Sequence, residues 1–321
     1  MTNIPLKTND FYYAWASDLN EDTGEGRLAR LFLYNFAKIN TKKVVIISKN
    51  DKYLFNNNKL KILNQRKKII KLNFPYFFLG NFFSWFFFFK KKKFIYINYL
   101  PLWNSLIILL LSPNTIVGPI TGSKIFSKNQ NIRKLLFPTL YRFNLFFLYI
   151  RFKKIIFATD NLRKYVKLRY IQKCSFNFCL LYVKYLKPLY FYDKTIDIII
   201  YNKTHKNKFN NFTKKLVFFL ISKKYNIHCF GENLNIFGVK NHGQISNKEA
   251  INLIKKSKYM INSGENFYTF FLMESIKYKV RIIYNKKTYP FTKPKINNIL
   301  GVDYDKQLVA STQILNYFHK N

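Results

Sequence analysis

Acidic residues are the scarcest charged groups in this sequence. Its 321 residues include 15 Asp and Glu against 55 Lys and Arg, which gives a formal net charge of +40. No acid occurs from residue 52 to residue 159, whereas five of the fifteen lie within the first 25 residues. Because a hard metal ion needs several oxygen ligands, so sparse a set predicts a site without a metal or other cofactor. The acids that remain are candidates for structural or chemical roles.

Cysteine is also scarce, and the chain opens without an apolar leader. Cys174, Cys179 and Cys229 are too few and too widely spread for a disulfide scaffold, so we expect a reducing compartment. The first twenty residues contain two acids and no continuous apolar stretch, so we expect no secretory signal and a cytoplasmic protein. Global disorder is excluded, since 49% of the residues are hydrophobic and 19% are aromatic.

Arginine is rare although the chain is strongly basic. Only nine of the 55 cationic residues are Arg, the side chain that best forms paired hydrogen bonds with bases and phosphates. The lysines are spread along the whole chain, and A/T-rich codons alone would produce the same excess. We weigh that explanation equally with a polyanionic partner. We therefore expect no nucleic-acid partner, and we favour an anionic membrane surface over nucleic acid.

Apolar runs alternate with helical periodicity along most of the chain. Residues 11–17 and 43–48 resemble strands on either side of a helix whose apolar positions run from 28 to 36, which is a βαβ unit. The same alternation recurs over residues 94–117 and again from residue 196 onward. The predicted fold class is α/β, with two Rossmann-like domains facing across a cleft and ligands at the carboxyl ends of the strands.

A change of pattern near Pro188 sets the predicted domain boundary. We expect an N-terminal Rossmann-like domain over residues 1–190 and a C-terminal one over residues 191–321. The final helix, about 305–319, could cap either domain, including by packing back on the first. Residues 51–71 are polar and basic and predict a surface excursion. Further elements are a strand at 154–159 and a helix that begins at residue 162.

Residues 72–89 are an uncharged, Phe-rich stretch followed by four lysines, Lys90 to Lys93. By its length this stretch could cross a bilayer, but it contains Pro75, Gly80 and Asn81, which argue against that. It suits a helix on a membrane surface, with its aromatic face inward and the lysines on lipid phosphates. The alternative is a buried crossover helix.

Two glycine-containing loops follow strands of the first domain. The first loop opens a helix, where glycine lets the backbone approach a ligand and the helix N-terminus favours an anion. Its candidate residues are Gly24, Glu25, Gly26 and Arg27. The second loop contributes Gly118, Thr121 and Gly122. The first loop lacks the third glycine of a dinucleotide fingerprint, and Glu25 could instead hydrogen-bond sugar hydroxyls. An ordinary turn is the alternative for each loop.

Two further groups of residues lie in the second domain. Lys203 and Lys208 follow a strand, where two ammonium groups can clamp a diphosphate. The segment 261–275 runs from a strand end through a Ser-Gly loop into a helix. Its candidate residues are Ser263, Gly264, Glu265, Asn266 and Glu274. Loop amides at a helix start suit a phosphate, and an acid two turns into the helix suits a ribose diol. The alternative for Glu274 is a surface acid paired with Lys277.

The stretch from residue 241 to residue 284 resembles the nucleotide-sugar-binding half of glycosyltransferases with the GT-B fold, especially the family-4-like group. The segment Ser246–Glu249 matches the helix with an acid near its start in that family. Glu274 looks like the family's second glutamate, which binds the nucleotide ribose. The first glutamate falls on Asn266 by spacing, or on Glu265 with one extra residue between. Asn266 is a departure, because it cannot act as a carboxylate.

The resemblance extends to the other candidate residues. In the family an Arg and a Lys five residues later bind the donor diphosphate, and Lys203 and Lys208 match that spacing with Lys in place of Arg. The loop at residues 24–27 looks like the family's acceptor- and phosphate-side loop. Many relatives place a His near the reacting sugar in the first domain, whereas the first His here is His205. A retaining mechanism, in which the donor phosphate handles the proton, is compatible with that absence.

The sequence thus predicts a glycosyltransferase at the cytoplasmic membrane face. It would move a sugar from a UDP- or GDP-linked donor to a lipid-linked or polysaccharide acceptor, without a metal. The candidate catalytic residues are Glu25, Glu265 and Asn266. The acceptor side is assigned to residues 1–190 and the donor side to residues 191–321. The alternative is a non-enzymatic nucleic-acid or anionic-surface binding protein on a degenerate two-domain scaffold. An isomerase or phosphorylase of the same fold ranks lower.

Overall fold

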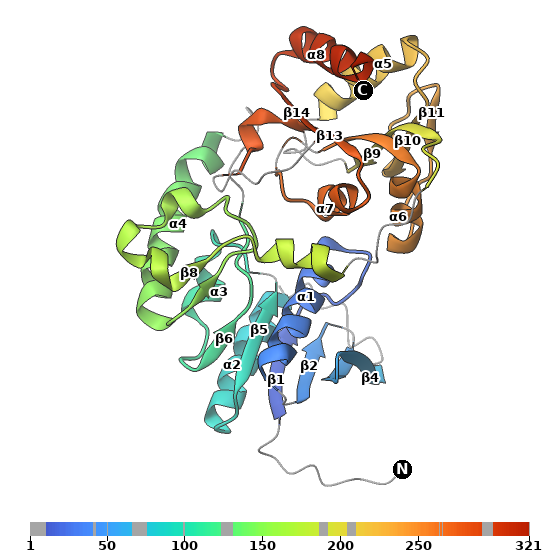
Figure 1. Ribbon diagram of the computed structural model, residues 1–321. Helices are drawn as coiled ribbons and strands as arrows, with labels where there is room; N and C mark the ends of the chain where they lie inside the picture. The colour runs from blue at the N-terminus through green and yellow to red at the C-terminus, as the bar shows by residue number, and fades with distance from the viewer. Residues whose placement is uncertain are drawn as a thin grey trace. The chain divides into compact units, whose positions relative to one another are not determined.

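The computed structural model of the protein contains two compact units. It describes residues 11–40, 43–49, 51–65, 76–98, 100–122, 131–185, 192–203, 210–262, 264, 266–290 and 298–320. Unit 1 consists of Met1–Gly122, Leu136–Thr159 and Lys164–Phe178, and unit 2 of Ser123–Leu135, Asp160–Arg163 and Cys179–Asn321. Each unit has its own six-stranded sheet (Figure 1). The boundary between residues 190 and 191 stays a prediction.

The centre of unit 1 is a parallel sheet. Its strands follow the order β4-β3-β2-β1-β5-β6. The four parallel strands are β1 (Phe11–Ala16), β2 (Lys43–Ser48), β5 (Phe94–Asn98) and β6 (Thr115–Val117). They are short apolar runs because helices cover both faces of the sheet. The predicted βαβ units are confirmed here.

A hairpin extends this sheet where the sequence predicted a surface excursion. β3 (Asp51–Asn56) pairs antiparallel with β2, and β4 (Lys59–Gln65) pairs antiparallel with β3. Asn57 and Asn58 form the turn with φ of 47° and 58°, a conformation that Asn adopts more readily than most residues. The two strands were not recognised in the sequence because both carry exposed polar side chains, which hide their period of two.

The helices of unit 1 lie on opposite faces of the sheet, since successive side chains of a strand alternate. Tyr12 of β1 meets Phe36 of α1 (Gly24–Ile39) with ring centroids 5.1 Å apart. Its neighbour Tyr13 stacks at 4.2 Å on Phe87 of α2 (Tyr76–Phe89). The Phe-rich segment is therefore a crossover helix packed on the sheet, although part of its surface is exposed.

Helix α3 (Ser105–Leu109) adjoins α2, and α4 (Asn131–Arg151) is in turn bonded to α3. The carbonyl of Leu110, just beyond the end of α3, receives a hydrogen bond from the Trp85 indole of α2 at 2.9 Å. The guanidinium of Arg151, at the end of α4, donates to the carbonyl of Ile108 at 2.9 Å. The three helices thus form a connected layer.

The segment after α4 departs from its prediction. The strand expected at 154–159 shortens to β7 (Ile155–Ile156), which pairs with β8 (Cys174–Ser175) in a separate two-stranded sheet. In place of the helix expected from residue 162, the chain forms the 3-10 helices Arg163–Tyr165 and Leu168–Lys173.

Unit 2 is a second doubly wound sheet, and all its pairings are parallel. The order is β11-β10-β9-β12-β13-β14. The strands are β9 (Ile196–Asn202), β10 (Ile227–Gly231), β11 (Val239–Asn241), β12 (Ser257–Ile261), β13 (Arg281–Asn285) and β14 (Ile299–Val302). Its helices are α5 (Asn210–Ser222), α6 (Asn247–Lys255), α7 (Phe270–Lys277) and α8 (Gln307–His319).

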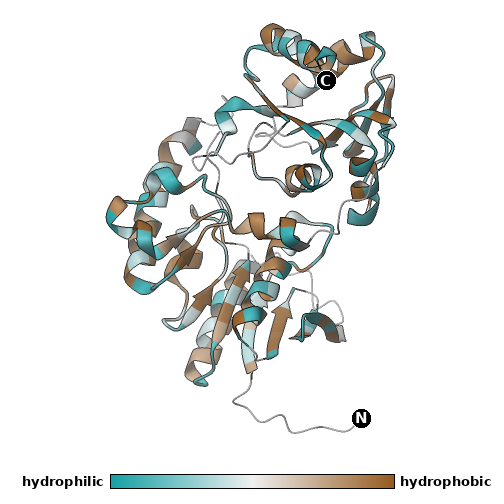
Figure 2. Cartoon of the chain, viewed as in Figure 1, coloured by the Kyte–Doolittle hydropathy of each residue, from teal (hydrophilic) through white to brown (hydrophobic). Residues whose placement is uncertain are grey.

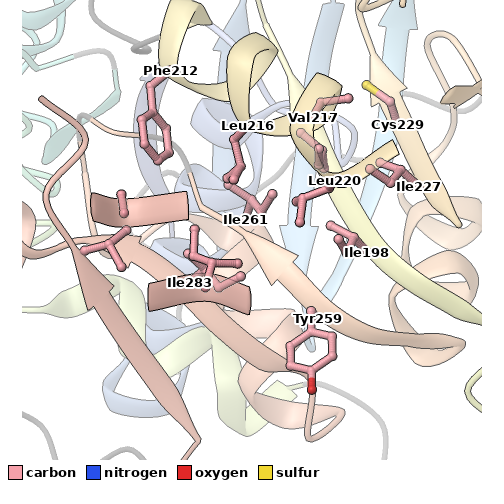
Figure 3. Close-up of a cluster of buried hydrophobic side chains, with 14 of the residues drawn as sticks. Ile198, Phe212, Leu216, Val217, Leu220, Ile227, Cys229, Tyr259, Ile261 and Ile283 are labelled. Atoms are coloured by element: carbon pink, nitrogen blue, oxygen red, sulfur yellow. The ribbon is translucent and has the colours of Figure 1, made fainter. Parts of the chain in front are cut away.

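A hydrophobic cluster holds α5 and α8 on the sheet of unit 2 (Figure 3). Leu216 and Leu220 of α5 face Ile198 and Ile261 of the central strands, and all four side chains are buried. Ile314 of α8 belongs to the same cluster, so the final helix packs within unit 2. In the part of the chain that the structure describes, no helix combines the length and apolar character needed to cross a membrane.

Gly80 is the point where α2 lies closest to the sheet. A Cβ there would come within 2.4 Å of Trp15 Cδ1 and of Tyr96 Cε2, and both rings are fully buried. We predict that Gly80→Ala lowers the free energy of unfolding by about 1–3 kcal/mol, even though Ala is the better helix former. Urea denaturation measures the change. Phe82→Ala, on the exposed face of α2, should shift it by less than about 0.5 kcal/mol. An unchanged Gly80→Ala would contradict this packing.

Candidate functional site

Each sheet has a switch point at which the strand order reverses. In unit 1 the chain winds from β1 to β2 and later returns to the other side of β1 as β5. In unit 2 it winds from β9 outward to β11 and returns on the other side of β9 as β12. In open α/β sheets ligands bind outside the carboxyl ends of the strands at such points. The candidate residues of each unit are therefore expected at the carboxyl edge of its own sheet.

Asn98 joins the two strands at the switch point of unit 1. It ends β5, and its side chain is only 1% exposed. Its Nδ2 donates to the carbonyl of Asp18 at 2.9 Å and to the carbonyl of Glu25 at 3.1 Å. Both hydrogens of the amide are thus used to tie the end of β5 to the loop that follows β1. The loop around residue 25 lies at this edge, as the sequence predicted.

The loop itself is closed by side-chain hydrogen bonds. Thr23 caps α1 by accepting from the backbone N–H of Gly26 at 3.0 Å, and its hydroxyl donates to the carboxylate of Asp18. The Arg27 guanidinium donates to the carbonyl of Glu21 at 2.7 Å, which joins the loop to the first turn of α1. Gly24 is exposed at the first position of α1.

Glu25 has a strongly shifted pKa. Burial, together with the nearby charge of Asp18, raises the pKa of Glu25 to about 7. Its Oε2 is buried and has no hydrogen-bond partner among the residues that the structure describes. A carboxyl group of this kind exchanges a proton near neutral pH and keeps an acceptor atom for a hydroxyl group.

The second glycine loop lies at the same edge. Gly118 follows β6 and donates to the carbonyl of Tyr96 at 2.8 Å. A Cβ on Gly118 would approach the carbonyl oxygen of Ile97 to 2.2 Å, so only glycine allows the chain to pass so close to β5. Thr121 bridges to Pro101, and Gly122 follows it, half-buried. The loop that follows β1 and the loop that follows β6 therefore lie at the same edge of the sheet, on either side of β5.

Asn262 organises the corresponding edge of unit 2. It follows β12, is 1% exposed, and donates through Nδ2 to the carbonyls of Asn266 and Phe267, each at 3.1 Å. Its Oδ1 accepts from the hydroxyl of Thr269 at 3.1 Å, and Thr269 in turn caps α7. One buried amide thus fixes the connection from β12 to the first turn of α7.

The loop that Asn262 supports carries the other predicted donor residues. Gly264 accepts at its carbonyl from the buried amide of Asn285, at the end of β13, at 3.3 Å. Asn266 accepts at Oδ1 from the backbone of Tyr268 at 3.2 Å and from the Asn161 amide at 3.1 Å. Asn266 is thus held by hydrogen bonds within unit 2. Ser263, Glu265 and Lys208 lie outside the described residues.

Glu274 is buried on α7 rather than exposed on its surface. Its side chain is 2% exposed, and Oε1 accepts a hydrogen bond from the hydroxyl of Tyr182 at 3.0 Å. Tyr182 belongs to the 3-10 helix Phe178–Tyr185, and its ring also packs edge-on against Phe270. The alternative of a surface acid paired with Lys277 is excluded by this burial. The carboxylate already binds one hydroxyl group, which is the chemistry expected of a diol site.

Of the predicted lysine pair, only Lys203 is among the residues that the structure describes. It follows Asn202, the last residue of β9, and is exposed. The Asn202 amide donates to the carbonyl of Glu232 at 2.9 Å, which ties β9 to the loop after β10. Lys203 therefore lies at the carboxyl edge of unit 2, as the sequence predicted.

The buried asparagines at these edges were not predicted from the sequence. Four strands end in, or are followed directly by, a buried Asn, namely Asn98, Asn202, Asn262 and Asn285. The signal was an apolar run closed by Asn, as in residues 94–98 (FIYIN) and 281–285 (RIIYN). In so Asn-rich a chain this pattern did not stand out.

Two acids at metal-ligand spacing also went unnoticed in the sequence. Asp303 and Asp305 are two residues apart, but Lys287 Nζ lies 3.2 Å from the first carboxylate and 2.5 Å from the second. In a separate pair, Nε2 of His242 lies 3.1 Å from Nδ1 of His228, and burial lowers the pKa of His228 to about 4. Across the described residues, no three His, Cys, Asp or Glu side chains come together as a metal site.

Comparison with solved structures identifies the architecture. A variant of S. aureus TarM, solved with fondaparinux, alpha-GlcNAc-glycerol and UDP, matches 83% of this chain with a TM-score of 0.53 and 10% identity. A UDP-N-acetylglucosamine 2-epimerase from Listeria monocytogenes matches 96% of it with a TM-score of 0.53 and 8% identity. This chain has the GT-B fold. The predicted fold class, two Rossmann-like domains of the GT-B type, is confirmed.

The likeness concerns the fold. This chain spans 55% of the length of the TarM variant and 88% of the epimerase. A second TarM structure matches 83% of this chain with a TM-score of 0.50 and 11% identity. No protein-family model matches the sequence, and no curated protein matches it.

The buried carboxyl of Glu25 leads to a prediction on stability. Since folding raises its pKa, the folded state holds this proton more tightly than the unfolded state does. The stability that this group contributes is therefore present at low pH and is lost as the pH rises through about 7. We expect Glu25→Gln to raise the free energy of unfolding at pH 8 by about 2 kcal/mol, and by much less at pH 5. Urea titrations at both pH values measure this. Glu21→Gln, at an exposed acid of the same loop, should show no such gain.

A second prediction concerns Asn262. Asn262→Ala leaves the carbonyls of Asn266 and Phe267 without their donor, so we expect a loss of about 1–3 kcal/mol in the free energy of unfolding. Asn262→Asp has the same shape but cannot donate, and should lose at least as much at pH 8. Asn316→Ala, at an exposed position of α8, is the matched control. Equal stability of Asn262→Ala and the control would contradict the role given to this amide.

Proposed function

We propose that this protein is a glycosyltransferase. It transfers a sugar from a UDP- or GDP-linked donor to a lipid-linked or polysaccharide acceptor, and it does so without a metal ion. The observation that carries the proposal is the carboxyl edge of unit 2. There a loop fixed by one buried amide leads into α7, and α7 holds a buried carboxylate already bonded to a hydroxyl group. In a chain of the GT-B fold, this arrangement suits the diphosphate and ribose of a nucleotide-sugar.

In this proposal unit 2 binds the donor. The backbone N–H groups at the start of α7 and the loop around Gly264 meet the diphosphate, with Lys203 and Lys208 supplying positive charge. Glu274 accepts hydrogen bonds from the ribose hydroxyls, and the Tyr182 hydroxyl marks where such a donor group lies. Ser263 adds a hydroxyl to the same loop. Asn266 faces the donor sugar as a neutral hydrogen-bonding group.

Unit 1 binds the acceptor. Glu25 holds a hydroxyl group through its buried carboxyl oxygen, and its pKa of about 7 allows it to gain or lose a proton at neutral pH. The loop residues Gly118, Thr121 and Gly122 lie along the same edge. We expect retention of configuration, with the donor phosphate accepting the proton. Inversion in the wild type together with inactive Glu25→Gln would instead assign Glu25 as the base.

The enzyme is proposed to act at the cytoplasmic face of a membrane. Its formal charge of +40 and the absence of any acid between residues 52 and 159 support attraction to anionic lipid. Lysines of this kind also attract nucleic acid, and tight, steeply salt-dependent DNA or RNA binding without any binding of a nucleotide-sugar would instead indicate a non-enzymatic binding protein.

Separate variants test the donor and acceptor halves. We predict that Glu274→Gln weakens donor binding about tenfold or more, because a charged acceptor of hydroxyl groups is lost. Glu249→Gln, at an exposed acid of the same unit, should leave it unchanged. Glu25→Gln should bind donor normally and turn over about tenfold more slowly, because the amide oxygen holds the acceptor hydroxyl more weakly than the carboxyl group does. Calorimetry with UDP- and GDP-sugars gives the affinities, and activity should persist in EDTA.

The reaction product separates transfer from the other chemistries of this fold. Proton NMR of the donor mixture distinguishes a transferred sugar, a hydrolysed sugar and an epimerised donor, and it reads the anomeric configuration. The proposal fails if no nucleotide-sugar binds and Glu274→Gln behaves as wild type. An epimerised donor formed without acceptor would replace the transferase with an isomerase.

A further inference from the structure

Helix α2 presents two different faces. Its inner face carries Gly80, Ser84 and Phe87, all buried against the sheet or α3. Its outer face carries aromatic rings one turn apart, and Phe82 and Phe89 are 62% and 75% exposed. Figure 2 shows the hydrophobic colour of this helix in unit 1. A soluble crossover helix normally turns polar side chains outward, so the exposed rings need an explanation.

Exposed apolar side chains also occur on the two helices that are linked to α2 by hydrogen bonds. α3 is joined to α2 by the bond from Trp85 to the carbonyl of Leu110, and α4 is joined to α3 through Arg151. We call the exposed large apolar side chains of α2, of residues 105–110 and of residues 143–150 in α4 the apolar face. Its members are Phe82, Trp85, Phe86, Phe89, Leu106, Leu110, Phe143, Phe146 and Ile150.

A cluster of lysines lies at one end of this face. Lys90 follows α2 and places its ammonium 4.2 Å from the centroid of the Phe86 ring. The next residues, Lys91 to Lys93, line a cavity of about 720 Å³ together with Tyr12 and Asn114. These residues precede β5 and β6, or lie near the start of β1, so the cavity opens at the amino edge of the sheet. The edge with Glu25 is the opposite one.

We propose that unit 1 docks on an anionic lipid bilayer through the apolar face, with a lipid phosphate held by the lysines of this cavity. The aromatic and aliphatic side chains enter the upper acyl region, and Lys91, Lys92 and Lys93 meet the headgroup layer. This inference rests on the proposed function only in giving the enzyme a membrane-bound acceptor. The docking itself does not depend on catalysis.

Charge complementarity selects an anionic bilayer as the partner. Residues 52–159 contain 19 Lys and Arg and no acid, so no carboxylate in α2, α3 or α4 opposes the approach of lipid phosphates. A nucleic acid would use the same lysines but has no apolar phase for rings that are mostly exposed. A basic surface with an apolar stripe is the pattern of helices that lie in the membrane interface.

Trp85 provides a separate argument for insertion. Its indole N–H is already bonded to the carbonyl of Leu110, while its side chain is 39% exposed. Moving the ring into acyl chains therefore leaves no donor without a partner, and the usual cost of burying a polar group is avoided. Similarly, the three carbonyls near the end of α3 that accept from Arg151, those of Ile108, Leu109 and Leu111, are satisfied within the protein.

Vesicle sedimentation with the full chain tests the docking. The probes are vesicles of phosphatidylcholine alone and of phosphatidylcholine with an equal part of phosphatidylglycerol. We expect binding to the mixed vesicles. The triple variant Phe82→Ser, Phe86→Ser, Phe89→Ser and the pair Lys91→Glu, Lys92→Glu should each weaken it about tenfold or more. On binding, Trp85 fluorescence should shift to the blue, and Trp85→Phe should remove that shift.

Matched controls in unit 2 separate this surface from the general charge of the chain. Phe218→Ser with Phe237→Ser removes exposed rings elsewhere, and Lys214→Glu with Lys215→Glu makes the same charge change on α5. Both controls should stay within about twofold of wild type. Donor binding in solution should be unchanged in every variant, so loss of docking is distinguishable from loss of the proposed function.

Three results would overturn the inference. Equal losses in the unit 2 controls would mean that total charge alone drives vesicle binding. Full vesicle binding by both the Phe triple variant and the Lys pair would place the contact elsewhere. Soluble glycerol phosphate or duplex DNA that occupies the lysines with the affinity of the vesicles, without any shift of Trp85 fluorescence, would replace the bilayer with a free phosphate or a nucleic acid.

Discussion

Buried asparagine amides at the ends of the parallel strands are the constraint on which both units depend. Where a parallel strand ends, the chain must leave the sheet while its backbone groups stay out of water, and each group needs a partner. An amide supplies two donors and an acceptor without a charge. Asn98 and Asn262 use both donors on loop carbonyls, so they fix the start of the connection to the helix. The geometry of both candidate edges follows from these bonds.

The same choice of residue explains why the remaining carboxylates are informative. An Asp in place of Asn98 or Asn262 would point a charge at two carbonyl oxygens, which is unfavourable in a buried position. Against this neutral framework, Glu25 and Glu274 are the buried acids of the two carboxyl edges. One has a raised pKa and an oxygen without a partner, whereas the other holds a tyrosine hydroxyl. A buried carboxyl group that costs stability at neutral pH is most simply explained by chemistry performed there.

The sequence predicted the strands and helices whose apolar pattern comes from burial. It did not predict the segments whose structure depends on a turn or on 3-10 geometry. The central strands of both sheets are continuous apolar runs, so they could be recognised without neighbours. The hairpin at 51–65 could not, because edge strands are half exposed and the decisive turn consists of two asparagines in the left-handed region. The segment after α4 forms 3-10 turns, which carry little periodic signal.

Site residues were predictable to the extent that their spacing is local. The order of strand, loop and helix predicts that Glu25 and Glu274 follow the carboxyl ends of strands, since strand direction alone decides this in a parallel sheet. Their surroundings were not predictable: Tyr182 reaches Glu274 from 92 positions away in the sequence, and Asn98 reaches Glu25 from 73. Such contacts depend on the folded topology, so the shift in the pKa of Glu25 could not be anticipated from the loop that contains it.

The acid-free stretch of the chain links composition to function. Four acids, Asp18, Glu21, Asp22 and Glu25, follow the carboxyl end of β1, whereas α2, α3 and α4 come from the region with none. The lysines that follow α2 and the basic residues of α4 have no acid beside them in these segments, so a membrane phosphate is attracted there, whereas the pKa of Glu25 is set by burial and by Asp18 of its own loop. Most of the net charge of +40 comes from lysines spread along the whole chain. Only a local group such as Lys90 to Lys93 distinguishes one face of unit 1 from another.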